Sequence, residues 1–262
     1  IDKKELSNII IEPTSIFHEQ QKQLLKQANY LTADYNIIVT NPPYLNNSYM
    51  DGILKQFVEE EYEETKTDLF SCFLSKYINK LSDNGYIGFI CPYVCMFLKS
   101  YTKLGEIVLD KTCIESLIQL EYNAFGPAVV PISTFVLKKI KNDSKMGTYI
   151  KLSSFKGVEN QPVKTLEAIK NPSIEYRYSV AQSMFKFIED YPISFWASQN
   201  VYNLFKEKGK IGDSTFFKTG VSTGNNERFT RFWFEIENDK FSYPTHFNSY
   251  NSNIKWYPLN NG

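Results

Sequence analysis

The sequence is poor in the residues that build metal centres and disulfide frameworks. Its 262 residues include only two histidines, His18 and His246, and four cysteines without a CxxC pair. Zinc sites need such closely spaced ligands, so we expect no metal site. Cys72, Cys91 and Cys95 lie in apolar stretches, which is typical of free, buried thiols in a cytoplasmic protein.

The sequence also has no long apolar run. The longest stretch, residues 86–98, contains Pro92 and is shorter than the roughly 20 residues that cross a bilayer. The first ten residues, IDKKELSNII, lack the apolar core of a secretory signal peptide. We therefore expect a protein without a membrane segment, located in the cytoplasm.

Glycine-rich loops and several catalytic motifs are missing as well. The first glycine is Gly52, and no GxG occurs anywhere. Without a P-loop or a GxSxG motif, the sequence argues against a nucleoside triphosphatase and an α/β-hydrolase. The nearest piece of a nuclease motif, Glu64-Thr65-Lys66, lies in a charged run without the preceding Pro-Asp. With 42% hydrophobic and 22% charged residues, the chain has the composition of a folded globular protein.

The formal net charge is zero, but the two halves of the chain differ. Residues 1–130 hold 11 basic and 17 acidic side chains, whereas residues 131–262 hold 18 and 12. A basic half can present a surface for phosphate groups, although a plain solvated surface gives a similar excess. The charge distribution alone therefore leaves a nucleic-acid partner and an ordinary surface equally open.

Helical patterns and short apolar runs alternate along the first 140 residues, and Asp68 stands where a helix needs an N-cap. The spacing of apolar residues predicts helices over residues 16–31, 69–81 and 102–110, and strands over residues 35–40, 86–91, 114–121 and 133–140. Such alternation is typical of an α/β sheet. The polar segment 45–66, by contrast, predicts a solvated and partly mobile loop.

The composition changes after about residue 145. Lys, Ser and Asn become more frequent and apolar runs shorter, before the aromatic-rich segment STFFKTGVSTGNNERFTRFWFEIE. We predict a first domain over residues 1–189 and the beginning of a second, more β-rich domain over residues 190–262. The chain shows no internal repeat.

The tetrapeptide NPPY follows the predicted strand over residues 35–40. Because Pro42 and Pro43 lack an amide hydrogen and have a fixed φ, the strand must end there. In open α/β sheets, ligands bind beyond the carboxyl ends of the strands. Asn41 offers a carboxamide oxygen and Pro42 a carbonyl oxygen that can accept hydrogen bonds from one amino group, and Tyr44 offers a flat ring for a planar base.

Two acceptors on one aromatic amine favour the pyramidal geometry that points its lone pair at a methyl donor. This is catalysis by positioning and preorganised electrostatics, and it needs no acidic or basic catalyst for the attack. We therefore interpret Asn41, Pro42, Pro43 and Tyr44 as a catalytic site.

The context of this tetrapeptide, VTNPPY, resembles that of the amino-methyltransferases that use S-adenosylmethionine, whose motif (D/N/S)PP(Y/F/W) follows an apolar strand. The helix beginning DLFSCF is similar to their next motif, which implies that Asp68, Leu69 and Phe73 contact the cofactor. The segment AFGPAVVPISTFVLKK resembles a later motif, which implies that Phe125 and Tyr44 stack on the target base. Ordinary core packing is the alternative for Leu69, Phe73 and Phe125.

Over residues 24–262 the sequence resembles the large adenine-specific DNA methyltransferases of BREX phage-exclusion systems, the PglX type, and their type IIG restriction-modification relatives. The resemblance implies a Rossmann-like methyltransferase sheet, followed by the start of a target-recognition domain, and methyl transfer to the 6-amino group of a flipped adenine. The implied partners are double-stranded DNA and other phage-defence or restriction subunits.

The resemblance also implies DNA contacts from the glycine-rich segment TGVSTGNNERF and its flanks. The residues expected to contact phosphates, sugars or base edges are Lys218, Ser222, Thr223, Asn225, Asn226, Arg228 and Arg231. A solvent-exposed cluster of turns is the alternative for this segment.

In that family a glycine-rich cofactor loop precedes NPPY, and this chain has none. Together with the start at Ile1, this predicts a fragment that lacks the N-terminal part of the sheet, is inactive alone and binds the cofactor weakly or not at all. Two further functions stay open. A protein-glutamine methyltransferase shares NPPY, but more than 200 residues follow the tetrapeptide here. A non-catalytic DNA-binding or interaction module with a degenerate methyltransferase fold would have no reason to keep all four residues.

Overall fold

The structure, a computed structural model, describes residues 18–124, 130–142, 144–208, 215, 223–242 and 254–259. The chain divides into two compact units, residues 1–209 and 210–262. None of the helices among the described residues is long and apolar enough to span a bilayer.

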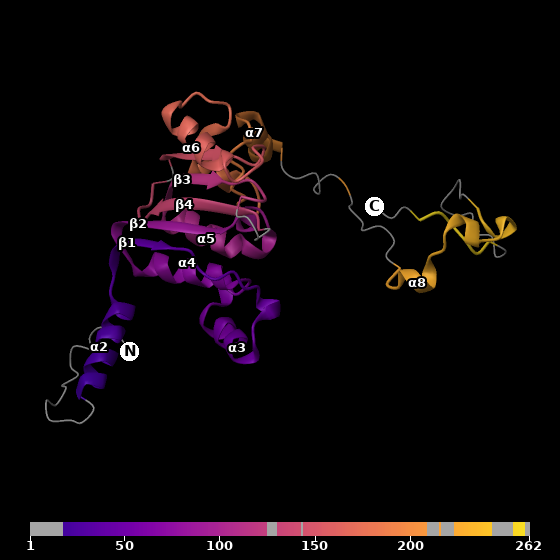
Figure 1. The fold of residues 1–262 in the computed structure, drawn as a ribbon. Coiled ribbons are helices and arrows are strands. Elements are labelled where there is room, and N and C mark those ends of the chain that lie inside the picture. The colour runs from indigo at the N-terminus through magenta and orange to yellow at the C-terminus, as the bar shows by residue number, and fades with distance from the viewer. Residues whose placement is uncertain are drawn as a thin grey trace. The chain divides into compact units, whose positions relative to one another are not determined.

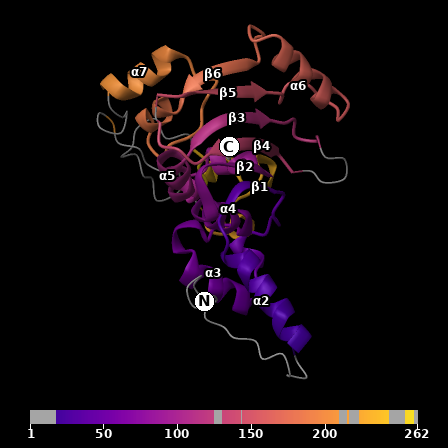
Figure 2. The ribbon, with the colours of Figure 1, turned by 90° about the vertical axis from the view of Figure 1, so that its left-hand side faces the viewer.

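The first unit is built on a six-stranded mixed sheet with the order β1-β2-β4-β3-β5-β6 (Figure 2). Its strands are β1 (Tyr35–Thr40), β2 (Leu81–Pro92), β3 (Cys113–Gln119), β4 (Ile132–Lys138), β5 (Met146–Lys151) and β6 (Arg177–Ala181). β1 pairs with β2, and β3 with β5, in parallel, whereas β4 runs antiparallel between β2 and β3. β1, β2, β3 and β5 therefore all point the same way, and their carboxyl ends share one edge of the sheet.

Helices cover the sheet unevenly (Figure 1). The helices of the first unit are α2 (His18–Thr32), α3 (Gly52–Glu61), α4 (Leu69–Lys80), α5 (Thr102–Lys111), α6 (Asn160–Lys170) and α7 (Gln199–Lys208). Short 3-10 turns occupy Asn47–Tyr49, Glu63–Thr65, Tyr93–Met96, Lys99–Tyr101 and Gln182–Phe187. α4 and α5 pack on one face, and α6 packs on the other face through Ala168, beside Ile150 and Leu152 of the β5 region.

The main core forms where α4 and α5 meet the sheet. Its buried side chains are Phe70, Leu74 and Ile78 of α4, Leu104 and Leu109 of α5, and Ile87, Phe89, Leu117, Phe135 and Leu137 of the strands. On β2 and β4 these residues alternate with less buried ones, because successive side chains of a strand point to opposite faces. The predicted helices and strands of the first 140 residues are present, and the α/β fold class is confirmed.

The prediction of a loop over residues 45–66 was wrong, and the predicted mobility of this segment stays a prediction. This segment contains α3, whose N-cap Asp51 accepts a hydrogen bond from the amide of Leu54 at 2.8 Å. One buried residue, Val58, anchors the helix against Met50 and Cys72 in a small separate core. Glu59, Glu60 and Glu61 lie exposed at the end of α3, and Glu63 and Glu64 lie in the 3-10 turn that follows. The polarity of this run concealed the helix in the sequence.

The first unit extends beyond the predicted domain boundary at residue 190. Phe195 and Tyr202 are fully buried, and the ring of Phe195 stacks on Tyr149 of β5 with 5.1 Å between centroids. Residues 190–208 thus belong to the core of the first unit, and the composition change near residue 145 marks the outer strands β5 and β6. The assignment of a recognition function to residues 190–262 stays a prediction.

In the second unit, the described residues form short elements. These are α8 (Asn226–Phe229), the 3-10 turns Trp233–Glu235 and Asn238–Lys240, and a bridge between Phe241 and Trp256. The expected β-rich character of this unit stays a prediction for its other residues.

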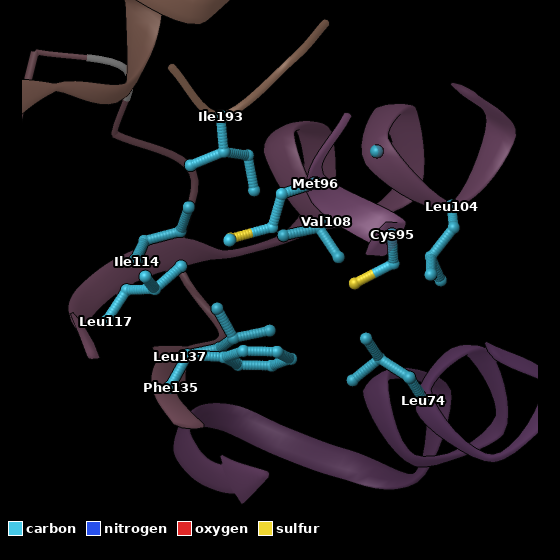
Figure 3. Close-up of a pocket in the computed structure, with 11 residues that line it drawn as sticks. Leu74, Cys95, Met96, Leu104, Val108, Ile114, Leu117, Phe135, Leu137 and Ile193 are labelled. Carbon is cyan, nitrogen blue, oxygen red and sulfur yellow. The ribbon is translucent and has the colours of Figure 1, made fainter. Parts of the chain in front are cut away.

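A small apolar cavity of about 30 Å³ lies in the main core. Figure 3 shows side chains that converge on it from α4, α5 and the sheet, among them Leu74, Val108 and Phe135. Gly105 of α5 also lines it. Because its lining is apolar, the cavity is a packing defect that water does not stabilise, and no predicted site residue borders it.

We expect Gly105→Ala to raise the free energy of unfolding by about 0.5–1 kcal/mol, since alanine suits a helix interior better than glycine. The new Cβ would meet its nearest neighbours, atoms of Tyr191, at 3.9 Å, an ordinary contact. Urea unfolding of the chain measures the change. The matched control is Gly147→Ala, whose Cβ would lie 2.6 Å from the carbonyl oxygen of Ile114 and should destabilise by about 1–3 kcal/mol. Equal effects of the two substitutions would contradict the expectation that position 105 has room for a methyl group and position 147 has not.

The outer edge of β1 has no partner strand among the described residues, where β1 pairs with β2 alone. Ile37 and Val39 of β1 are 67% and 79% exposed. An apolar, unpaired edge strand is a template for association with another chain. We predict that residues 1–262 alone associate with increasing concentration and that Val39→Lys suppresses this, as measured by light scattering. Ile53→Lys, at an 86% exposed position of α3, is the control: an equal effect there would point to general apolar exposure and away from the strand edge.

Candidate active site

The tetrapeptide Asn41-Pro42-Pro43-Tyr44 stands at the carboxyl end of β1. Asn41 is exposed and Pro42 is buried. The neighbouring strand β2 ends at the same edge, and the amide of Tyr93, just after it, donates to the carbonyl of Pro131 at 2.9 Å. The connection from β3 to β4 therefore starts and ends at this edge. Phe125 belongs to that connection but lies outside the described residues.

Tyr44 closes the tetrapeptide on itself. Its hydroxyl donates to Oδ1 of Asn41 at 2.7 Å and lies 3.3 Å from the carbonyl oxygen of Ile90. Its ring packs edge to face on Phe70 of α4, with 6.2 Å between centroids. Oδ1 of Asn41, which we expect to accept a hydrogen bond from an amino group, thus already accepts one from the hydroxyl of Tyr44. In the part of the chain that the structure describes, no side chain or loop amide donates to the Pro42 carbonyl oxygen.

The environment of Tyr44 keeps it a donor. Burial, and to a smaller extent the neighbouring Cys91, raise the pKa of its hydroxyl to about 12. At neutral pH the hydroxyl therefore carries its proton, and the bond to Asn41 persists across the physiological range.

Asp68 is the N-cap of α4 and is 7% exposed. Its Oδ1 accepts hydrogen bonds from the amides of Leu45, at 3.0 Å, and Phe70, at 3.3 Å. Burial raises the pKa of the carboxyl group, and the backbone amides of Phe70, Leu45 and Leu69 oppose this rise. The residue that the resemblance assigned to the cofactor thus also joins the loop after Tyr44 to α4.

Leu69 and Phe73 are both half-buried on α4. Leu69 packs against the small core of Met50, Val58 and Cys72, and Phe73 contacts Tyr77 edge to face at 5.7 Å. Their remaining exposure leaves apolar surface on α4. Their predicted cofactor contact stays a prediction.

The predicted DNA-contacting residues are only partly described, because Lys218 and Ser222 lie outside the described residues. Asn225 is the N-cap of α8 and accepts from the amide of Arg228 at 3.0 Å, and Thr223 donates to Oδ1 of Asn226. Arg231 donates to the carbonyl of Glu227 at 2.8 Å. Several of these polar groups thus shape their own turn, while their side chains remain exposed.

Aromatic side chains surround this turn. The guanidinium of Arg228 lies over the ring of Phe229 at 5.2 Å, and that of Arg231 lies 6.0 Å from Trp256. A hollow of about 780 Å³ in this unit is lined by Arg231, Trp233 and Trp256 among others. Of the described ion pairs, none involves Arg228, so the pairing with Glu227 or Glu235 that sequence reasoning offers as an alternative is not formed.

Sequence reasoning missed the supports of the site. The amide of Leu45, the residue after Tyr44, is bound by Asp68. The ring of Phe70 packs on that of Tyr44, and Tyr101 stacks on Phe70 with 5.6 Å between centroids. Phe70 carried only the signal of a core position, and Leu45 carried none. Among the described residues, no three His, Cys, Asp or Glu side chains gather in a way that could hold a metal ion.

The chain is similar in sequence to known adenine-specific methyltransferases. Residues 1–125 match the Eco57I restriction-modification methylase family. One relative is the adenine-specific methyltransferase PglX of Lacticaseibacillus casei, with 29% identity over 100% of this chain and 22% of that protein. Another is the adenine-specific methyltransferase BrxX of Escherichia coli, with 28% identity over 91% of this chain and 19% of that protein. The chain thus spans about a fifth of the length of these relatives.

Among solved structures, the Type ISP restriction-modification enzyme LlaGI, a nuclease-deletion mutant in complex with a DNA substrate mimic, is similar at a TM-score of 0.49 and 14% identity. The similarity covers 76% of this chain and 18% of that one.

We expect Tyr44→Phe to lower the free energy of unfolding by about 0.5–1.5 kcal/mol, the usual net contribution of a hydrogen bond, because the ring packing on Phe70 is kept while the bond to Asn41 is lost. Denaturant unfolding of the chain measures the change. Tyr49→Phe, at an 81% exposed position, should leave stability unchanged. A neutral Tyr44→Phe would show that this hydrogen bond contributes nothing to the fold.

Proposed function

We propose that this chain, whose residues 1–125 match the Eco57I restriction-modification methylase family, carries the amine-binding site of an adenine-specific DNA methyltransferase of a phage-exclusion or restriction-modification system. The single observation that supports this most is the NPPY tetrapeptide at the carboxyl end of β1, with Asn41 exposed and with no donor to the Pro42 carbonyl among the described residues. The chain spans about a fifth of the length of its relatives. We therefore assign the methyltransferase activity to the natural gene product that contains this chain.

In this mechanism Oδ1 of Asn41 and the carbonyl oxygen of Pro42 each accept one hydrogen of the 6-amino group of a flipped adenine. The two bonds localise the nitrogen lone pair, so that the nitrogen would be the nucleophile toward a bound methyl donor. The donor would lose its methyl group and leave as the thioether, and the methylated nitrogen would release one proton to solvent. Fixed acceptors lower the barrier because they need no reorganisation during the reaction.

Tyr44 is proposed to orient Asn41 and to stack on the base with its ring. Its hydroxyl donates to Oδ1 of Asn41, and because a carboxamide oxygen has two lone pairs, the same oxygen can also accept from the amino group. Phe125, on the connection between β3 and β4, is proposed to approach the base as a second stacking group.

S-adenosylmethionine supplies the methyl group when bound, as the methyltransferase family implies. Leu69 and Phe73 are proposed to contact it through the apolar surface they leave exposed on α4. Cofactor contacts from outside this chain are part of the same proposal, since no GxG loop occurs in these 262 residues.

Double-stranded DNA is the proposed partner, together with other subunits of the defence system, and the proposed location is the cytoplasm. The second unit, residues 210–262, is proposed to begin the target-recognition domain. Within it, Lys218, Arg228 and Arg231 would contact phosphates, and Ser222, Thr223, Asn225 and Asn226 sugars or base edges.

In the natural gene product, Asn41→Ala should lower kcat for methylation of adenine-containing duplex DNA by about 10²–10³-fold, the usual effect of removing one preorganised hydrogen-bond group. The dissociation constant for DNA should change less than about twofold, because Asn41 acts on the attacking amine. Transfer of radioactive methyl groups and a DNA-binding assay measure the two quantities.

Tyr44→Phe is the matched control for this experiment. It removes the hydroxyl but keeps a stacking ring, so methylation should stay within about fivefold of the unsubstituted enzyme. Wild-type kcat in Asn41→Ala would overturn the assignment. Methyl transfer to a glutamine-containing peptide, but not to DNA, would identify the protein-glutamine reaction, for which the same acceptors are suited.

A further inference from the structure

We propose that Asp68 is the positioning residue of this site: it sets the conformation of the NPPY loop through the backbone and does not act by binding the cofactor. The proposal deepens the proposed function and rests on it.

The first observation is a backbone junction between the NPPY loop and the segment before α4. Oδ1 of Asp68 accepts the amide hydrogen of Leu45 at 3.0 Å, and the amide of Leu69 donates to the carbonyl of Leu45 at 2.9 Å. One residue further, the amide of Asn47 donates to the carbonyl of Thr67 at 3.1 Å. Residues 45–47 therefore run antiparallel to residues 67–69, with a bridge between Asn46 and Asp68.

The second observation is that the same oxygen begins α4. Oδ1 of Asp68 also accepts from the amide of Phe70, and the ring of Phe70 is the one on which Tyr44 packs. A single carboxylate oxygen thus fixes the residue that follows Tyr44 in sequence and the residue that contacts its ring. Both supports of Tyr44 move if Asp68 loses this oxygen.

Because Asp68 is buried, the loss of its hydrogen bonds to the amides of Leu45 and Phe70 is costly. Asp68 is 7% exposed, so water does not readily replace the carboxylate when its oxygen is removed, and amides left without an acceptor are costly. Displacement of catalytic groups by about 1 Å can lower a rate about 10²-fold. The expected effect of losing the junction therefore falls on the rate of methyl transfer.

The chain contains a matched comparison. Asp51 is also an N-cap, of α3, and its Oδ1 accepts from the amide of Leu54 at 2.8 Å. Asp51 is exposed, and its side chain caps a helix without joining it to the NPPY loop. Substitution of Asp51 tests the loss of an N-cap alone.

The experiment compares Asp68→Ala, Asp68→Asn and Asp51→Ala in the natural gene product. Hydrogen exchange of a peptide covering residues 41–49, read by mass spectrometry, reports the junction without any need for activity. Methylation kinetics and the dissociation constant of S-adenosylmethionine report the function. Asp68→Ser is included because serine remains a good N-cap but has a shorter side chain, so α4 stays capped if the alanine variant does not fold.

We expect Asp68→Ala and Asp68→Ser to speed exchange in residues 41–49 by at least about tenfold and to lower kcat about 10–100-fold, with a cofactor dissociation constant within about twofold. Asp68→Asn keeps an accepting oxygen and should restore both exchange and kcat to within about threefold. Asp51→Ala should leave both unchanged.

Three results would overturn the proposal. A tenfold weaker cofactor affinity in Asp68→Ala with an unchanged kcat at saturation would make Asp68 a cofactor contact. An Asp68→Asn variant as slow as Asp68→Ala would show that the negative charge acts. Unchanged exchange in residues 41–49 would remove the junction itself. If the unsubstituted protein methylates no DNA, the proposed function fails, while the exchange measurement still decides the role of Asp68.

Discussion

Two consecutive prolines impose the constraint on which the site depends. Pro42 and Pro43 cannot donate to the sheet, so β1 ends at Thr40 and the chain turns away from β2 at the edge where the parallel strands end. The same lack of amide hydrogens leaves the Pro42 carbonyl without a local competitor. Asn41, held between strand and prolines, points a carboxamide into the exposed edge. Strand termination and acceptor placement thus have one cause.

A loop that contains two prolines still needs support on its other side. That support comes from α4: Phe70 lies under the ring of Tyr44, and Asp68 holds the backbone of Leu45. In this arrangement Tyr44 donates to the very oxygen that the proposed mechanism reserves for an amino group. The acceptor is therefore oriented before a substrate binds, which spares the cost of ordering a free side chain.

The sequence predicts the part of this structure that follows from local periodicity and from proline. The strand over residues 35–40, α4 with its cap Asp68, and the position of NPPY at a strand end are all as expected. α3 was missed although Ile53, Leu54, Phe57 and Val58 have the spacing of one helix face, because the prediction relied on the polar and acidic composition of residues 45–66. The role of Asp68 toward Leu45 was missed for a different reason: it joins residues 23 positions apart, and such pairing depends on the tertiary fold, which propensity does not encode.

The basic excess in the second half of the sequence does not lie in the unit that is proposed to contact DNA. Residues 131–208 carry 12 basic and 7 acidic side chains, and residues 209–262 carry 6 and 5, so the excess belongs to the first unit. There much of it has partners within the protein: Lys145 pairs with Glu115, and Lys186 with Asp110 at 2.9 Å. Long-range attraction by net charge therefore gives the second unit little advantage. If that unit contacts DNA, the contact depends on individually placed groups such as Arg228, Arg231 and the asparagines of the turn before α8, and on the aromatic rings that surround them.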